Sequence, residues 1–165
     1  METTTFKTSL DSLAWVITIG ITILFASIIG FQIVIITDHG KNGVIFTSIT
    51  LSLIYFIAYG FSPGNYLVSK NEIIINRLFF KVHIPLKSIM HAEILDKKKI
   101  AWSLRTFGVG GLFGYFGKFL NYSQGSMTWY ATRRDKVVLI QTVQNKKIIL
   151  TPDDPELFLD ALKLP

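Results

Sequence analysis

Two long segments without a charged residue constrain the fold more than any other feature of this chain. The first runs from Ser12 to Thr37 and the second from Asn42 to Ser69. About 20 apolar residues in a helix cross a hydrocarbon core of roughly 30 Å. Neither segment has the polar stripe, repeated every 3.6 residues, that marks a soluble amphipathic helix. We therefore predict two transmembrane helices, over residues 12–37 and 43–62.

The short connection between the two segments, "DHGKN" at residues 38–42, sets their arrangement. Helices joined so tightly are antiparallel neighbours, so both ends of the chain lie on the same side of the membrane. From residue 64 onward the chain has 15 Lys and Arg against 8 Asp and Glu, whereas the connection offers one Lys. Positive residues favour the cytoplasmic side. We predict a multi-pass inner-membrane protein with both termini in the cytoplasm.

Aromatic and small residues in and beside the two segments have expected places in such a hairpin. Tryptophan and tyrosine gather where a membrane meets water, and small residues four apart allow close helix packing. Gln32 is the one strongly polar side chain in the first span, and it is expected to snorkel or to bond the partner helix. The predicted aromatic belt is Trp15, Tyr55, Tyr59 and Tyr66, and the predicted packing residues are Ala26, Gly30, Ser48 and Ser52.

The rest of the chain, residues 64–165, alternates short apolar runs with polar turns. "IIINRLF", "SIMHAEIL", "MTWYAT", "VVLIQTV" and "IILT" are typical of strands in a small antiparallel barrel or sandwich. "TPDDPELFLDALK" is typical of a helix start, in which Asp153 or Asp154 caps and Pro155 occupies the first turn. The predicted fold class is α+β. Residues 1–63 hold the N-terminal segment and the hairpin, and residues 64–165 form a β-domain capped by a helix at about 154–163.

This second part resembles the bacterial pleckstrin-homology-like (PH) family over roughly residues 64–164. The resemblance rests on the early strand hairpin, "IPLKSI", a glycine-rich insert before "WYAT", and above all "ILTPDDPELFLDAL". It implies a bent seven-stranded barrel plugged by the C-terminal helix, often placed after a pair of membrane helices. It implies a binding role more readily than an enzyme. The basic first hairpin that binds lipid in eukaryotic relatives is only loosely matched here, by Lys70, Arg77 and Lys81.

The segment "RTFGVGGLFGYFGKF", residues 105–119, is too apolar for an ordinary loop and too rich in glycine for a good helix or strand. Three interpretations stay open for residues 106–117. The segment inserts into the membrane interface, folds over the β-domain and the lower end of the hairpin, or receives a helix of a partner protein. The candidate interface residues are Arg105, Phe107, Leu112, Phe113, Tyr115, Phe116 and Lys118.

The remaining candidates form a basic surface, because turns such as "DKKK" and "RRDK" concentrate positive charge. The candidate ligand residues are Lys70, Arg77, Lys81, Lys97, Lys98, Lys99, Arg133 and Arg134. The chain has no cysteine, no histidine pair at metal spacing and no nucleophile motif, so we expect no catalytic residue, metal or cofactor.

Beside a bilayer, a basic domain favours anionic lipids, so we expect membrane lipids rather than nucleic acid as partners. The predicted function is a membrane-anchored, non-enzymatic module that binds lipid head groups or a protein partner, including a second copy of the chain. The alternative is an accessory subunit of a membrane transporter or protease complex, recognised through its helices.

Overall fold

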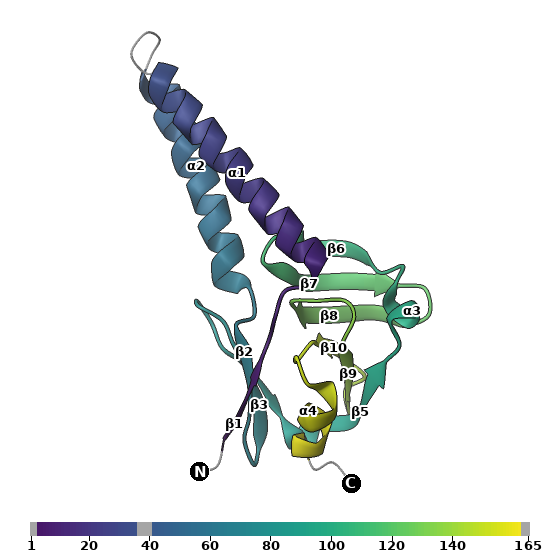
Figure 1. Cartoon of the computed structure of the whole chain (residues 1–165). Helices are drawn as coiled ribbons and strands as arrows, with labels where there is room; N and C mark the ends of the chain where they lie inside the picture. Colours follow the sequence, from purple (N-terminus) through teal and green to yellow (C-terminus); the bar gives the residue numbers. More distant parts are fainter. Residues whose placement is uncertain (1–2, 36–40, 163–165) are drawn as a thin grey trace.

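Two long helices rise from one end of a β-domain that contains two sheets and two short helices (Figure 1). The computed structural model describes residues 3–35 and 41–162. Most of the expected "DHGKN" turn and the last residue of the expected C-terminal helix lie outside these ranges. The helices are α1 (Ser12–Ile35), α2 (Lys41–Phe61), α3 (Lys97–Ile100), α4 (Pro155–Leu162) and the 3-10 turn η1 (Leu86–Ser88). The strands are β1 (Thr4–Lys7), β2 (Asn65–Val68), β3 (Glu72–Asn76), β4 (Val82–Pro85), β5 (Ile89–Leu95), β6 (Leu104–Gly111), β7 (Gly114–Asn121), β8 (Gly125–Ala131), β9 (Val137–Thr142) and β10 (Lys147–Leu150).

The strands form two separate sheets, and the expected closed barrel is wrong. Sheet A is antiparallel with the order β1-β2-β3-β4, and sheet B has the order β5-β9-β10-β8-β7-β6. Sheet B is mixed, because β8 and β10 run parallel. β4 is an edge of sheet A and β6 is an edge of sheet B, so each has one side without a paired strand in its sheet. The predicted α+β class and the C-terminal helix are confirmed.

The prediction of two membrane spans is supported for one helix. Among the described residues, Ser12–Ile33 of α1 is long and apolar enough to cross a membrane, and only 6% of its apolar window is buried within the chain. A core helix of a soluble protein would be mostly buried. The apolar part of α2 is shorter, Ile45–Phe61, which gives about 26 Å of helix against a core of roughly 30 Å. Multi-pass insertion therefore does not follow from length and composition.

Two apolar clusters hold the β-domain together, one on each face of sheet B. On the first face, sheet A and α4 pack against β9 and β10, with Phe158 of α4 in contact with the rings of Phe6 and Tyr66. On the second face, Trp129 stacks on Phe119 at a ring distance of 4.4 Å. Ala14, from the first turn of α1, belongs to this second cluster. The start of α1 is thus part of the core of the β-domain.

The glycine-rich segment is a β-hairpin rather than a loop. β6 and β7 pair along nearly their whole length, with a bulge between Arg105 and Phe107. Gly108 and Gly117 face each other across this pair, and both have a positive φ. A Cβ on Gly117 would lie 2.3 Å from the backbone oxygen of Phe107. The glycines that argued against a strand therefore allow two strand backbones to approach closely.

Substitution of Gly117 by alanine is expected to destabilise the chain. The added Cβ meets backbone at a φ of 123°, which costs about 1–3 kcal/mol of unfolding free energy. Gly110→Ala is the matched control in the same hairpin, because its Cβ would first meet the Arg105 side chain at an ordinary 3.5 Å. Thermal unfolding in detergent measures both. Equal unfolding temperatures would contradict the backbone contact.

The buried hydroxyl of Tyr66 is expected to make the folded chain less stable at alkaline pH. Its hydroxyl donates to the Tyr130 backbone oxygen at 2.5 Å and accepts from the Thr151 N–H at 3.1 Å. Burial raises the pKa of Tyr66 from 10.0 to about 12. The unfolded chain loses this proton first, so stability that is complete below about pH 10 is lost as the pH rises through about 12. Denaturant unfolding across this range should show a shallower decline for Tyr66→Phe than for Tyr122→Phe, which alters an exposed tyrosine. Equal slopes would argue against a buried hydroxyl at position 66.

Candidate functional site

The Asp11 side chain fixes the start of α1 to the β-domain. One carboxylate oxygen accepts hydrogen bonds from the Ala14 N–H at 2.8 Å and from the Tyr115 hydroxyl at 3.1 Å. The other accepts from the Arg134 N–H at 3.0 Å. Burial, with the charge of Asp11 added, raises the pKa of Tyr115, so the phenol stays protonated and remains a donor. Asp11 is therefore the N-cap of α1, and it also bonds α1 to β7 and to the turn after β8.

Asp153 holds the segment just before Asp11 in the same way. Its carboxylate accepts from the backbone and hydroxyl of Ser9 at 2.9 and 2.7 Å, and from Arg133 at 3.1 Å. Arg133 also pairs with Asp135 at 2.6 Å, and this hydrogen bond holds the pKa of Asp135 below its usual range. The expected α4 cap at Asp153 is therefore replaced by contacts with the N-terminal segment, while the Asp154 backbone oxygen accepts from Phe158 N–H.

The turn between β6 and β7 packs against both long helices. The Phe113 N–H donates to the Thr18 hydroxyl at 2.9 Å, and the Phe113 ring packs edge-on against Tyr55 at 4.9 Å and Tyr59 at 5.3 Å. Tyr55 also shares a 2.6 Å hydrogen bond with Thr22. The hairpin turn therefore touches α1 and α2 together and braces them at their base.

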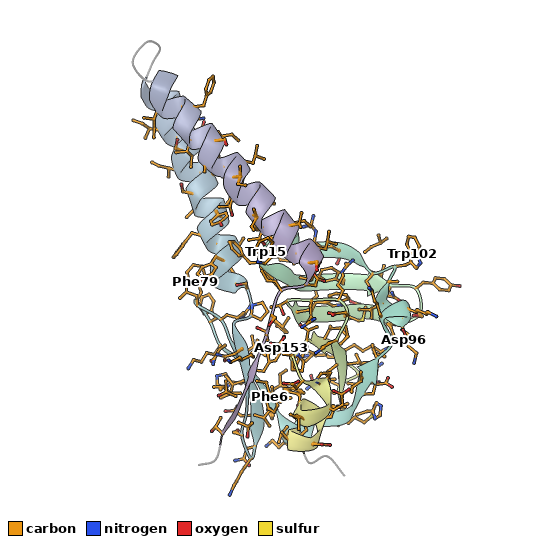
Figure 2. All side chains as sticks on the ribbon, in the orientation of Figure 1. Phe6, Trp15, Phe79, Asp96, Trp102 and Asp153 are labelled. Carbon is orange, nitrogen blue, oxygen red and sulfur yellow. The ribbon has the colours of Figure 1, made fainter. Side chains whose placement is uncertain are left out.

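A second loop, residues 77–81 with the sequence "RLFFK", lies against the end of α2. The Phe79 ring packs on Phe56 and Phe61, and its N–H donates to the Gly60 backbone oxygen at 3.2 Å (Figure 2). A Cβ on Gly60 would lie 2.1 Å from the Phe79 ring, so this approach requires glycine. Leu78 and Phe80 in the same loop are about 60% exposed.

Between these two contacts lies a groove, defined here as the cavity of about 530 Å³ under the last turns of α2. Its roof is Ile57, Ala58 and Phe61, and its floor is the face of sheet B that carries Phe116 and Tyr130. The size falls in the range of small-molecule sites. Side chains of opposite sheet B faces alternate along β7, so Phe116 lines the groove while Tyr115 faces the core.

Two cations line this groove. The Arg77 guanidinium lies 5.6 Å from the Phe61 ring centroid and 5.3 Å from that of Tyr130, and its Nε donates to the Phe80 backbone oxygen at 3.1 Å. The Lys118 ammonium donates to the Thr128 hydroxyl at 2.7 Å. Within residues 3–35 and 41–162, no carboxylate lies within 4.0 Å of either cation. The groove is therefore apolar with two uncompensated positive charges.

The predicted interface residues separate into different environments. Phe113 lies at the level of Tyr59, whereas Tyr115 and Phe116 are buried. Leu112 is half-buried, and Arg105, Phe107 and Lys118 are exposed. One part of the segment therefore packs on the helices, as the second interpretation expected. Insertion of the exposed side chains into a membrane interface stays a prediction.

The predicted belt and helix-packing residues also divide. Trp15 and Tyr59 are exposed and Tyr55 is half-buried, but Tyr66 is fully buried and cannot contribute to a belt. Of the four predicted packing residues, Ser48 makes a hydrogen bond between the helices, in which its hydroxyl donates to the Gln32 side-chain oxygen at 2.7 Å. Ala26, Gly30 and Ser52 are exposed, and a Cβ on Gly30 would meet no atom within 4 Å. These three residues do not pack α1 closely against α2.

The predicted basic surface is dispersed over the domain. Arg77 and Lys81 are in the loop at the end of α2, Lys70 is in the turn between β2 and β3, and Lys97, Lys98 and Lys99 form α3. Arg133 is committed to Asp135 and Asp153, and the Arg134 guanidinium stacks over the rings of Tyr115 and Trp129. The structure does not bring these eight residues together.

Sequence reasoning missed the anchoring by Asp11 and the contact of residues 77–81 with the end of α2. An aspartate directly before a long apolar run is a standard helix-start signal, so Asp11 was detectable as a cap. Its bonds to Tyr115 and Arg134 depend on tertiary structure. In "RLFFK", two aromatics between two cations form an interfacial pattern, but the segment was assigned to flanking strands.

Substitution of Asp11 by alanine should loosen the junction of helix and domain. The lost cap and the unpaired Tyr115 hydroxyl together cost about 1–3 kcal/mol of unfolding free energy. Asp160→Ala on α4 is the matched control, because that aspartate is exposed and lies on a different helix from Asp11. Denaturant unfolding in detergent compares the two variants. A stability loss no larger than that of Asp160→Ala would exclude an anchoring role for Asp11.

Comparison with known protein families gives one finding. Residues 64–164 match the family described as Bacterial PH domain, which is more than half of the chain. Searches of curated proteins and of solved structures found no match. The matched range begins just after α2 and ends at α4, so it contains the strands β2–β10 and the groove floor. The chain belongs to the bacterial PH domain family.

Proposed function

We propose that this chain is a membrane-tethered, non-enzymatic binding module that holds its PH domain at the cytoplasmic face of the membrane. The observation that carries the proposal is the pairing of β1 with β2. These strands directly precede α1 and follow α2, and they pair antiparallel from Thr4↔Val68 to Lys7↔Asn65. The helices therefore leave the domain and return to it at the same end, as a membrane hairpin requires.

The surface at this end of the domain supports contact with a bilayer. In Figure 2, Trp15, Phe79 and Trp102 lie toward the end of the domain from which the helices rise, and Phe6 lies further from it. Trp102 is 87% exposed and Phe107 is 76% exposed. Exposure of tryptophan and phenylalanine side chains to water is unfavourable, whereas a membrane interface accommodates these side chains. These side chains would lie against lipid while the two helices are inserted.

The length of α2 is compatible with this arrangement, although its apolar part alone is short. Gln32 and Ser48 bond each other across the two helices, as do Thr22 and Tyr55, so four polar groups are satisfied within the pair. A short span is accommodated by local thinning of the bilayer or by its neighbour helix. We therefore propose that α2 enters the membrane beside α1.

Single-cysteine labelling tests this topology, because the chain has no cysteine of its own. Leu24→Cys on α1 and Leu53→Cys on α2 are matched, since both leucines are 54% exposed in the structure. In sealed vesicles, a membrane-impermeant maleimide should label neither variant until detergent is added. Ser126→Cys, on β8, should react only in vesicles whose cytoplasmic face points outward.

Each outcome of this labelling has a distinct meaning. Reaction of the Leu53→Cys variant alone in sealed vesicles would place α2 outside the bilayer and overturn the hairpin. Reaction of both helix variants would overturn membrane tethering. Labelling of the Ser126→Cys variant from the opposite face would reverse the proposed orientation.

A further inference from the structure

The groove under α2 has a shape and position suited to a ligand that comes from the membrane. It opens directly beside Ile57 and Phe61, which are in the last turns of a helix that we propose to be inserted. Phe107 and Val109 on the edge strand β6 line its other side. An apolar chain could pass from lipid into this groove without crossing water.

A second cavity of about 530 Å³ continues the groove away from α2. It shares Lys118, Thr128 and Tyr130 with the groove, and it runs between the β4 edge and sheet B. Its lining is more polar and includes His83 and Lys146. Together the two cavities have an apolar end next to α2 and a more polar end next to β4. Lys118 lies where they join.

The two groove cations have donors left for an anion. Among the described residues, the Arg77 guanidinium makes its hydrogen bond through Nε, which donates to a backbone oxygen. Lys118 directs one bond to Thr128, and an ammonium has three N–H donors. Stacking on Phe61 and Tyr130 holds the Arg77 side chain in place, so little entropy is lost when it binds. Guanidinium and ammonium groups both bind phosphate well.

From these observations we propose that the groove binds a single membrane amphiphile with one acyl chain in the apolar end and a phosphate head group between Arg77 and Lys118. The inference rests on the proposed function, because the ligand enters from the bilayer. A docked peptide would not require two uncompensated cations beside an apolar roof. The proposal therefore specifies an anionic lipid rather than a protein segment.

The test uses the full chain in phosphatidylcholine nanodiscs and a lysophosphatidic acid with a photoreactive acyl chain. Saturable crosslinking is expected in α2 and in β6 or β7. Lys118→Gln should weaken the apparent affinity about tenfold, because one charge-assisted contact is lost. Val109→Trp should abolish labelling by filling the groove with an indole. Lys99→Gln is the control, since it removes the same charge from exposed α3.

Three comparisons separate the possible ligands. Equal labelling by a neutral monoacylglycerol with the same chain would overturn the phosphate contact. Displacement by millimolar inorganic phosphate alone would identify a free anion site and overturn the lipid. Labelling that is unaffected by both Lys118→Gln and Val109→Trp would overturn the groove as the site. Thermal unfolding of each variant confirms that the fold is retained.

The outcome of this test can be separated from that of the topology test. Saturable groove labelling together with cysteines that react in sealed vesicles would mean that the lipid site is correct and the tether is wrong. Protected cysteines without groove labelling would mean the reverse.

Discussion

The carboxylate of Asp11 determines how the helices stand on the β-domain. It caps α1 and is bonded to Tyr115 of β7 and to the backbone of Arg134 after β8. Asp153 holds Ser9, two residues earlier, to the start of the C-terminal segment. Because a helix is stiff, fixing its first turn fixes the direction of the whole span. The hairpin turn at Phe113 and the loop at Phe79 then brace the far side of the pair.

The groove exists because sheet B is wider than the surface that covers it. Sheet A and α4 pack on β9 and β10, so the same face of β6, β7 and β8 is left without a second sheet. A closed barrel would fill this space with side chains. Here α2 forms a partial roof instead, and Arg77 and Lys118 both line the remaining space. The open architecture and the candidate site are thus the same feature.

Much of the fold was predictable because its signals are local. Charge-free segments predicted α1 and α2 within a few residues at the described ends, and Pro155 with its acidic neighbours predicted α4. The family was also identified correctly, from "ILTPDDPELFLDAL". β1 was missed because "TTFK" is short and polar, and only its pairing with β2 makes it a strand. The hairpin at 104–121 was missed because facing glycines depend on register, which is not local. Arg77 and Lys118 were both named, but in separate sets, because the groove that joins them requires the tertiary fold.

The position of β1 has a consequence for the order of assembly. Synthesis produces this strand before both long helices, yet its partner β2 emerges only after them. Sheet A therefore cannot be completed until the intervening helices have found each other and turned the chain back. A nascent chain whose helices fail to associate keeps β2 as an open edge, whose unpaired backbone groups favour pairing with other chains. Completion of the sheet thus reports that the helices have been placed correctly.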